Sequence, residues 1–496
     1  MGSGTEGTAM LWARGVVDAR DPADGAAAVR GCPPDAAAGR AWAPGAVSFT
    51  VTWVGFLAVT IAWHADSSPV ALSVYVSVAW TAPALISLRG IAGGLQSRVR
   101  LREPRPGDVR LESGLLILCV PTVARHDVLP ALERSLRSYE RVLPAYVSRF
   151  RVDVVVDEGS AAVDTIRAIA RRSPHVRVVV VPASYTTARS TRFKARANQY
   201  ADELRIAEGE AGDDVWVLHM DDDTSIGVDT AIEVSRFVEE NPPGDGSSRH
   251  LAQGVLSFPR ELSRNRLTWL ADSVRPGCDV SLFAISTGRG HPHTGLHGEL
   301  LLVRASVEAS IGWDFGPHST VEDAEFALRF AHRCPGRSGW IPCRSYGASP
   351  ATVADFLRQR ERWFAGLLRL SFEARIPLRH RALMLHNIVV WSLAPLAYPG
   401  IVLMAAYAVG AGAVAPVATV LLPVWATNVA FGVWLYWEGF KINAASSETA
   451  PRPWERLAVI GLMPCFALLE CLAIARAMFA LVRRRDTRFV VIAKPA

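Results

Sequence analysis

Short apolar segments alternate with amphipathic ones between about Leu111 and Ser371, and each apolar segment ends in polar or turn residues. Strands that alternate with helices are typical of βαβ units, so we predict an α/β domain with a doubly wound, mostly parallel sheet. Ligands of such sheets bind outside the carboxyl ends of the strands, which makes the residues after each strand the candidate site. The expected strands are residues 115–120, 152–156, 176–181, a run that begins at Val215, and 300–303, with a helix at 128–139.

The apolar run that begins at Val215 ends in three consecutive carboxylates, Asp221, Asp222 and Asp223. Successive side chains of an extended chain alternate in direction, so Asp221 and Asp223 are expected to converge on one ligand while Asp222 faces elsewhere. Adjacent carboxylates repel each other, and a hard divalent cation that bridges to a diphosphate is a common reason for such a pair. The triplet therefore predicts a metal site, and a solvated acidic turn is the alternative.

Two further segments are candidates for nucleotide binding. Asp157 follows the second strand, and Lys194 and Arg196 lie at the start of a helix just before the triplet. The two basic side chains can neutralise a nucleotide diphosphate or contact its base, and a solvated basic helix face explains them equally well. After the first strand the chain reads Pro-Thr-Val-Ala-Arg instead of the G-x-G-x-x-G of dinucleotide-binding domains, which argues against NAD or FAD.

A second acidic cluster begins at Ser319. Ser319-x-x-Glu322 has the spacing of a capping box, in which an acid in the first helical turn is stabilising. A capping box does not require the adjacent Asp323. At the N-terminus of a helix, that carboxylate can project into the cleft and act as a general base.

Residues on the acceptor side are expected in two places. His297-Gly298-Glu299 precedes the strand at 300–303, and a glycine there lets an acceptor approach the backbone closely. Residues 351–372 are expected to form a basic amphipathic helix at a membrane surface, with Arg358, Arg360 and Arg362 among its polar positions.

Within that helix Gln359, Arg362 and Trp363 share one side because they lie at i, i+3 and i+4. An aromatic ring can stack on a sugar, and an arginine can hold a phosphate. The alternative is that these residues only anchor the helix at the interface.

Hydrophobic residues make up 50% of the chain, which suggests that part of it lies in lipid. Residues 1–42 lack sustained periodicity and are expected to be disordered. Apolar runs at 46–63 and 70–88 predict a transmembrane hairpin over 43–90, and the arginine-rich segment after it places the following domain in the cytosol. A buried helical hairpin of a soluble protein is the alternative.

Three more apolar runs, 384–409, 413–436 and 457–481, make up the expected C-terminal membrane segments at 382–482. If each run crossed once, the basic tail at 483–496 would lie outside, against the positive-inside tendency. The preferred interpretation is that the last run breaks near Pro464 into a re-entrant or interfacial hairpin. A plain third crossing is the alternative.

Composition excludes some classes of partner. The net charge is +6, but no basic tract is interleaved with aromatic residues, so no nucleic acid partner is expected. The seven cysteines show neither a CxxC pair nor a zinc spacing and are interpreted as reduced core residues.

Taken together, the motifs resemble the ordered series of family 2 membrane glycosyltransferases: a nucleotide-contacting Asp, a D-x-D, an E-D base motif and a Q-x-x-R-W helix. The resemblance covers about residues 111–370. A narrower resemblance, to the egghead-type β-1,4-mannosyltransferases, rests on residues 193–200, 269–275, 320–323, 356–363 and 488–491. The chain departs from that group in having Asp-Asp-Asp-Thr where Asp-Glu-Glu-Thr is more common, and His297-Gly298-Glu299 where Gly-Ser is expected.

The resemblance implies a GT-A-like cytosolic domain at 111–350 that transfers a sugar with inversion from a nucleotide-sugar to a lipid-linked or membrane-proximal hydroxyl. GDP-mannose is the favoured donor, and Mg²⁺ or Mn²⁺ is the expected cofactor. A glycolipid and membrane lipids are the expected partners. The expected location is the plasma membrane of a bacterium. The implied roles are Asp323 as base; Asp157, Lys194, Arg196, Asp221 and Asp222 for the nucleotide-sugar; Asp221 and Asp223 for the metal; and His297, Gly298, Glu299, Glu322, Gln359, Arg362 and Trp363 for acceptor or diphosphate.

Two alternatives stay open at this point. One is a processive polysaccharide synthase of the cellulose, chitin or hyaluronan type that uses a UDP-sugar. The other is a non-catalytic membrane sensor of nucleotide-sugars.

Overall fold

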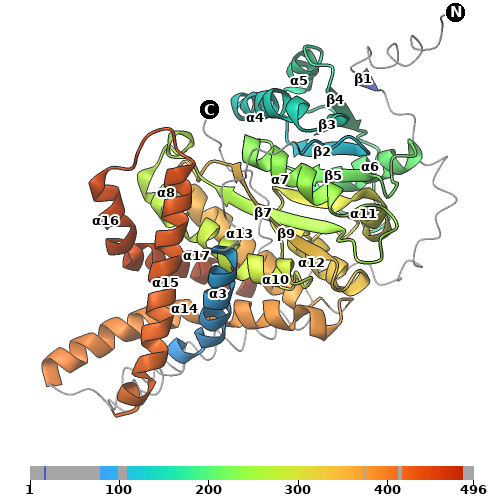
Figure 1. Ribbon diagram of the computed structural model, residues 1–496. Coiled ribbons are helices and arrows are strands. Elements are labelled where there is room, and N and C mark those ends of the chain that lie inside the picture. The colour runs from blue at the N-terminus through green and yellow to red at the C-terminus, as the bar shows by residue number, and fades with distance from the viewer. Residues whose placement is uncertain (1–15, 18–78, 99–108, 374, 412–415, 484–496) are drawn as a thin grey trace, which may run out of the picture.

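The computed structural model describes residues 16–17, 79–98, 109–373, 375–411 and 416–483 (Figure 1). The strands in these residues form one sheet in the order β1-β4-β3-β2-β5-β8-β7-β9-β6. Helices cover the sheet, and a further group of helices lies beside this domain, at the lower left of Figure 1. The predicted α/β domain with additional helices is therefore confirmed in outline.

One half of the sheet is parallel, as predicted. β2 (Leu115–Thr122) pairs in parallel with β3 (Phe150–Asp157) and with β5 (Val215–His219). β3 pairs in parallel with β4 (Val176–Val181), and β4 with β1 (Val16–Val17). The carboxyl ends of β3, β2 and β5 consequently meet at one edge of the sheet.

The other half is mixed, so among the described strands the sheet is mostly parallel, as predicted, but not parallel throughout. β8 (Leu301–Arg304) is antiparallel to both β5 and β7 (Leu251–Ser257). β9 (Ser338–Tyr346) is parallel to β7 and antiparallel to β6 (Ser225–Ile226). Because β8 runs against β5 with Leu301 opposite His219, the residues just before β8 lie at the carboxyl end of β5.

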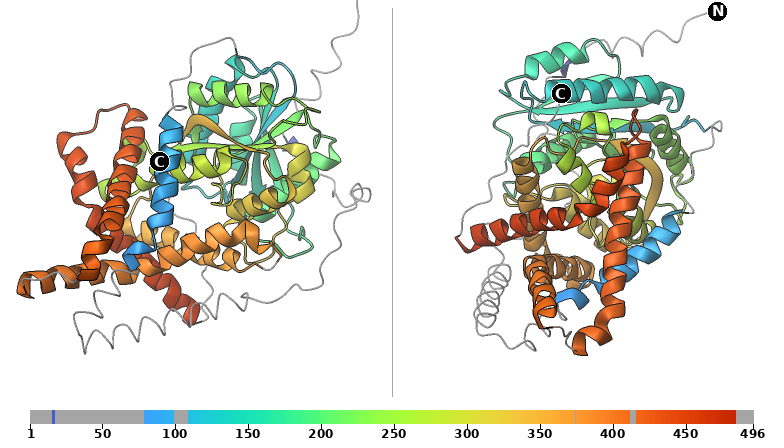
Figure 2. Two further views of the ribbon diagram at one scale, coloured as in Figure 1. Left: turned by 60° about the horizontal axis from the view of Figure 1, so that its bottom comes forward. Right: turned by 90° about the vertical axis from the view of Figure 1, so that its left-hand side faces the viewer.

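The sheet lies between two helical layers, because side chains of its strands alternate between two hydrophobic clusters. Leu116 and Leu118 of β2 belong to one cluster, and Ile117 and Cys119 to the other. The first cluster includes residues of α4 (Leu129–Val142), α5 (Val163–Ala170) and α7 (Val228–Glu239); the second includes residues of α6 (Phe193–Ala207), α11 (Ala305–Ile311) and α12 (Glu322–Arg333). The two views of Figure 2 show this layered domain beside the other helices.

Between β7 and β8 the chain forms a series of short helical segments that the sequence did not predict. They are α8 (Arg266–Ala271), α9 (Val274–Cys278), a π-helical turn (Asp279–Phe283) and α10 (Ala284–Gly288). The side chain of Asn265 caps α8 by accepting from the backbone N–H groups of Leu267 and Thr268. This connection contacts both the sheet domain and the C-terminal helices.

The remaining helices are α3 (Ala84–Arg98), α13 (Val353–Ser371), α14 (Leu378–Ala411), α15 (Pro416–Ala445), α16 (Pro453–Gly461) and α17 (Met463–Val482). α15 lies directly against the residues before α9. A Cβ atom at Gly439 would be 1.6 Å from the carbonyl oxygen of Ser273, so the close approach requires glycine there.

The predicted helix at 351–372 is confirmed as α13, and the last apolar run breaks at Leu462, with Pro464 in the first turn of α17. Of the residues that the structure describes, α17 is the one helix whose length and composition would allow it to cross a membrane. The expected tail at 1–42 lies outside the described residues apart from Val16–Val17, and so do the run at 46–63, residues 70–78 of the second run and the basic tail after Arg483.

Candidate active site

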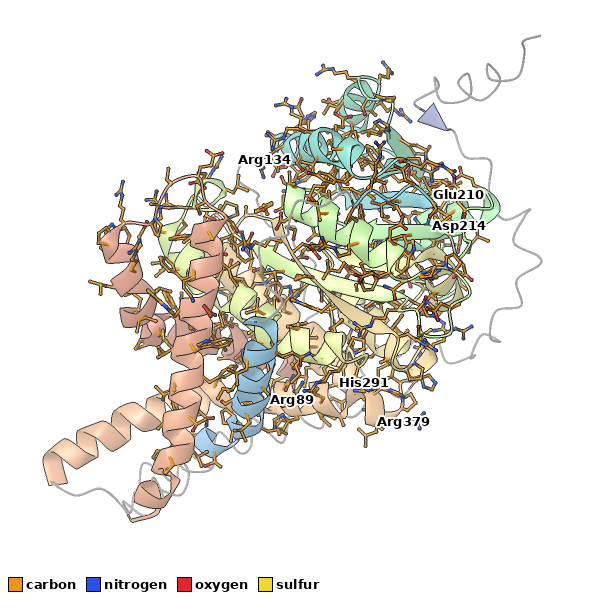
Figure 3. All side chains as sticks on the ribbon, in the orientation of Figure 1. Arg89, Arg134, Glu210, Asp214, His291 and Arg379 are labelled. Carbon is orange, nitrogen blue, oxygen red and sulfur yellow. The ribbon has the colours of Figure 1, made fainter. Side chains whose placement is uncertain are left out.

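A cavity of about 1860 Å³ opens at the carboxyl edge of the parallel strands and continues between the helices beside the sheet. In Figure 3, Glu210 and Asp214, which precede β5, lie on the side of the sheet domain opposite Arg134 of α4. Of the fourteen predicted site residues, thirteen line this cavity and Arg196 does not: Asp157, Lys194, Asp221, Asp222, Asp223, His297, Gly298, Glu299, Glu322, Asp323, Gln359, Arg362 and Trp363.

The three carboxylates follow β5 in a turn and not in extended chain, since the backbone N–H of Thr224 donates to the carbonyl of Asp221 at 3.1 Å. Asp222 was predicted to face away from Asp221 and Asp223 because side chains alternate along an extended strand. This alternation does not apply to a turn. Asp222 also lines the cavity, and its Oδ2 accepts a hydrogen bond from the Thr122 hydroxyl at 2.6 Å. The three carboxylates lie close together near Tyr139. Burial is the largest cause that raises the pKa of Tyr139, and the negative charges of Asp223, Asp221 and Asp222 raise it further.

Lys194 lies in the first turn of α6 and forms an ion pair with Asp221. Its ammonium group also donates to the carbonyl of Gly298 at 3.0 Å. Burial opposes the charged ammonium, but Asp221 and Glu322 outweigh it and raise the pKa of Lys194. Lys194 therefore keeps its positive charge at its position between the triplet and the segment before β8.

Arg196 is placed behind the cavity wall. Its guanidinium forms an ion pair with Asp157 and donates to the backbone carbonyls of Pro182 and Tyr185, at 2.8 and 3.0 Å from Nη2. It therefore orients Asp157 and does not itself line the cavity, and the contact of Arg196 with a nucleotide stays a prediction.

The donor set of the triplet fits a divalent cation. Among the described residues, no group of three or more His, Cys, Asp or Glu side chains has the arrangement of a closed metal site. Mg²⁺ and similar ions usually keep several waters and substrate oxygens and need only one or two protein carboxylates. Asp221 and Asp223, which both line the cavity, can supply these two ligands.

The predicted capping box at Ser319 is wrong. α12 begins at Glu322 with Val321 as its N-cap residue and has no side-chain cap, and the Ser319 hydroxyl donates to Glu325 at 3.0 Å instead. Glu322 and Asp323 are consequently free of a capping role, and both carboxylates line the cavity. The Oδ1 atom of Asp323 accepts the backbone N–H of Ala324 at 2.8 Å, which fixes the carboxylate at the start of the helix.

Asp323 lies close to Lys194 across Gly298. A Cβ atom added to Gly298 would be 2.6 Å from Nζ of Lys194 and 3.5 Å from Oδ2 of Asp323. Burial and the neighbouring Glu322 raise the pKa of Asp323, and the positive charge of Lys194 lowers it. The resulting pKa of Asp323 is about 7. A carboxylate with a pKa near neutrality is suited to accept a proton at physiological pH.

Glu299 is buried and His297 is partly buried, and both are paired with residues of the connection between β7 and β8. His297 Nε2 is 2.6 Å from Oδ1 of Asp279, and this carboxylate raises the pKa of His297 although burial acts against it. Glu299 accepts from Arg275 at 3.1 Å, and burial together with Asp221 raises the pKa of Glu299. The two side chains thus line the cavity as members of a polar network and not as isolated groups.

α13 brings Gln359, Arg362 and Trp363 to the cavity, as their spacing predicted. Arg362 donates to the carbonyl of Thr320 at 3.4 Å, which joins α13 to the residues before α12. The guanidinium of Arg275 lies 4.5 Å from the centre of the Trp363 ring, and that of Arg360 lies 4.4 Å from it. The indole of Trp363 therefore makes cation–π contacts with two guanidinium groups.

Arg360 itself was predicted to lie among the polar positions of a surface helix, and this is wrong, because its side chain is 2% exposed. It is paired with Asp272 at 2.5 Å and with Glu470 at 2.7 Å. Its partners are separated from it by 88 and 110 positions in the chain. Local periodicity cannot detect such partners.

Four site residues were missed by motif analysis: Asp272, Arg275, Asp279 and Glu470. Asp272 and Arg275 lie within the segment 269–275, which was noted only for its resemblance and to which no role was given. Glu470 carried a signal of its own, since an acid in an apolar run is expensive in lipid unless it faces protein or water.

The part of the cavity away from the carboxylates is apolar. It is lined by side chains of α3, α14, α15 and α17, which include Ile86, Trp391, Phe431, Leu435, Met463 and Leu468. Pockets for one small molecule usually measure roughly 300–1,000 Å³. A cavity of about 1860 Å³ with a charged end and an apolar end has room for two substrates of different polarity.

Comparisons with known proteins agree with the resemblance seen in the motifs. Residues 216–436 match the protein-family model described as Glycosyl transferase family group 2. The β-1,4-mannosyltransferase egh of Drosophila melanogaster is 29% identical over 296 residues, which are 58% of this chain and 60% of that protein. The β-1,4-mannosyltransferase bre-3 of Caenorhabditis elegans is 28% identical over 227 residues, 45% of this chain and 48% of that protein.

The matched part thus spans about half to three-fifths of the length of these relatives. Both are animal proteins, so they give no support to the predicted bacterial location. Among solved structures, a mannosyltransferase from Pyrobaculum calidifontis in complex with GDP-Man and Mn²⁺ is 16% identical, with a TM-score of 0.46 over 81% of this chain and 98% of that one.

Proposed function

Since residues 216–436 match family group 2 of the glycosyltransferases, we propose that this chain is a membrane-associated enzyme that transfers a sugar from a nucleotide-sugar to an acceptor hydroxyl. GDP-mannose is the favoured donor, because the curated relatives are named β-1,4-mannosyltransferases. The acceptor is a lipid-linked sugar or glycolipid, and the new linkage is β.

The donor occupies the polar end of the cavity. Asp157, which Arg196 orients, and Asp222 contact the nucleoside, while Lys194 and Asp221 lie at the diphosphate. Lys194 carries a lasting positive charge, because its acidic neighbours raise the pKa of the ammonium group. This charge stabilises the negative charge that develops on the leaving nucleoside diphosphate.

Asp221 and Asp223 would hold a Mg²⁺ or Mn²⁺ ion. When bound, such an ion supplies further positive charge for the leaving diphosphate. The residues around it set the position of the sugar: Gly298 leaves room at the backbone, and His297 and Glu299 fix the segment before β8.

Asp323 is the general base. It takes the proton from the acceptor hydroxyl while the hydroxyl oxygen forms a bond to the anomeric carbon and the bond from that carbon to the diphosphate oxygen breaks. Attack from the face opposite the leaving group converts an α-linked donor into a β-linked product. The pKa of about 7 keeps a large fraction of Asp323 ionised at neutral pH.

The acceptor reaches the base from the apolar end. Side chains of α14, α15 and α17 line that part of the cavity, and α17 is apolar enough to lie in a membrane. Gln359, Arg362 and Trp363 of α13 stand between the two ends, where they position the acceptor sugar and the diphosphate. Glu322 lies beside Asp323 and raises its pKa.

One observation supports this proposal more than any other: Lys194, Asp323 and Gly298 meet at one point. Lys194 is paired with Asp221 of the triplet, and a Cβ at Gly298 would contact both Nζ of Lys194 and Oδ2 of Asp323. Groups that hold a diphosphate and a group that accepts a proton are therefore close enough to act on one sugar between them.

A donor panel with purified membranes that contain the protein tests the proposal. We expect release of GDP from GDP-mannose, dependent on a divalent metal and on an added alkyl glucoside, and a product that carries one additional sugar. Long products would indicate a processive synthase instead. Nucleotide binding without turnover of any donor would contradict the proposal and favour a sensor.

A further inference from the structure

We propose that Glu470 of α17 is a specificity-determining residue of the acceptor site, where its carboxylate oxygen Oε2 accepts a hydrogen bond from a sugar hydroxyl. The inference rests on the proposed function, because it assumes that the cavity receives an acceptor sugar. It adds a residue from the C-terminal helices to the binding groups that the sheet domain and α13 supply.

The first argument is the position of the acid. Glu470 lies in the middle of a helix that is otherwise apolar enough to cross a membrane, and there an ionisable side chain is expensive unless it faces protein or water. In the structure the side chain of Glu470 turns inward: it lines the cavity together with Trp363 and Gln359 and is 19% exposed. An acid at such a position is more readily explained by function than by stability.

The second argument is that the carboxylate is fixed in orientation. Its Oε1 accepts from Nε of Arg360 at 2.7 Å. Arg360 cannot rotate away, because it is also paired with Asp272 at 2.5 Å and its guanidinium lies 4.4 Å from the ring centres of both Phe356 and Trp363. The direction in which Oε2 points is therefore determined by buried neighbours.

The third argument is that Oε2 is left without a partner. This atom is buried and has no hydrogen bond to any residue that the structure describes. A buried charged oxygen without a hydrogen bond is costly, so a native site that retains one usually offers it to a ligand or a water. A hydroxyl group of a sugar is a suitable donor.

The charge balance indicates the chemistry of that ligand. Arg360 carries one positive charge, and Asp272 and Glu470 together can carry two negative charges. Arg275, the other cation at the Trp363 ring, is itself paired with Glu299, so the cluster keeps an excess of negative charge, which attracts hydrogen-bond donors. The aromatic face of Trp363 beside it adds a surface on which a sugar ring can pack. Together these groups fit a neutral, hydroxyl-bearing sugar.

The test uses the full-length protein in membranes, with GDP-mannose as donor and octyl β-glucoside as acceptor probe. In Glu470→Gln, the amide oxygen still accepts from Arg360, while an NH₂ group replaces the free oxygen and turns an acceptor into a donor. We expect the apparent KM for octyl β-glucoside to rise about tenfold or more, as for loss of a specific hydroxyl contact. The KM for GDP-mannose and its slow hydrolysis without acceptor should stay unchanged, which a merely structural defect would not allow.

Glu361→Gln is the matched control. Glu361 on α13 pairs with Arg476 on α17 at 3.3 Å, so it joins the same two helices, and its side chain is about as exposed as that of Glu470, at 20% against 19%, but neither Glu361 nor Arg476 lines the cavity. We expect this variant to keep the wild-type KM for both substrates. Glu470→Asp, which keeps the charge near Arg360 but withdraws the oxygen by one methylene, should show the same increase in KM as Glu470→Gln.

A KM for octyl β-glucoside in Glu470→Gln and Glu470→Asp that stays within twofold of the Glu361→Gln value would overturn the role of Glu470. So would an equal loss of donor hydrolysis and transfer. If the wild-type protein neither transfers mannose nor hydrolyses any nucleotide-sugar, the proposed function itself is wrong, and that result is distinguishable from the failure of Glu470 alone.

Discussion

Lys194, in the first turn of α6, is ion-paired with Asp221, the first carboxylate after β5. Its ammonium group also donates to the carbonyl of Gly298, so one side chain joins the donor-side turn to the segment before β8.

Lys194→Met removes the charge but keeps the length of the side chain. We expect the KM for the nucleotide-sugar to rise roughly tenfold to a hundredfold, which corresponds to the loss of charge-assisted hydrogen bonds. Lys441→Met is the control, because Lys441 lies on α15 and pairs with Glu438 of the same helix. Steady-state kinetics at varied donor concentration measure the effect, and equal KM values for the two variants would contradict it.

Gly298→Ala adds a Cβ atom 2.6 Å from Nζ of Lys194. The ammonium lies at the far end of a flexible side chain and can move, so the expected result is weaker donor binding and nearly unchanged stability. Gly246→Ala is the control, since nothing lies within 4 Å of a Cβ there. Titration with GDP and a thermal unfolding curve separate the two effects, and unaltered GDP affinity in Gly298→Ala would be evidence against the assignment.

Asp323→Asn keeps the shape of the side chain but removes the base. We expect the rate of transfer to fall by a factor of about 10² to 10⁴ or more, while GDP binding stays nearly intact. Asp164→Asn, at a side chain that is 89% exposed, controls for the substitution itself. Full activity of Asp323→Asn would refute its role as base.

The pH dependence follows from the pKa of Asp323. The base works only when deprotonated, so kcat/KM should rise with pH through about 7 and then level off. Glu322→Gln removes a negative neighbour that raises this pKa, and the rising limb should move to lower pH. A pH–rate profile of each protein measures the limb, and a limb that moves to higher pH in Glu322→Gln would contradict the origin of the shift.

Stability should depend on pH in a related way. The pKa of Asp323 is higher in the folded state than the ordinary value of 3.8, so its contribution to stability is present below about pH 4 and is lost as the pH rises through about 7. Asp323→Asn cannot ionise and does not suffer this loss. Its melting temperature relative to wild type should therefore increase between pH 5 and pH 8, as thermal unfolding at both values will show.

Removal of divalent metal should abolish transfer. Asp221 and Asp223 supply only two carboxylates, so a chelator is expected to remove the ion readily, and added Mg²⁺ or Mn²⁺ should restore activity. In Asp223→Asn the metal concentration for half-maximal activity should rise. Undiminished transfer after chelation, with no metal found by elemental analysis, would exclude the metal site.

The parts of the fold that depend on local pattern can be predicted from the sequence. The strands around Leu115 and Val215, the polar residues at their ends, and the shared side of Gln359, Arg362 and Trp363 follow from periodicities of two and 3.6 residues, which are readable in a short window. The structure has strands and a helix at these positions and brings the predicted residues to one cavity.

Features that depend on partners distant in the chain cannot be predicted in this way. The direction of β8 is set by its pairing with β5 and β7, and the alternation of apolar residues is the same for a parallel and an antiparallel strand. The burial of Arg360 depends on Asp272 and Glu470, which no local pattern connects to it. The turn at Asp221–Asp223 is likewise set by tertiary contacts such as that of Thr122 with Asp222.

Among the described residues, the helix that is best suited to lie in a lipid bilayer also forms part of the wall of the cavity, through Met463, Leu468 and Glu470. A shortened fragment that ends before Met463, made to obtain a water-soluble enzyme, would therefore lose this wall. It would admit bulk water to the ion pairs around Arg360 and weaken them. Detergent or nanodisc preparations that retain α17 are the form in which acceptor use has to be measured.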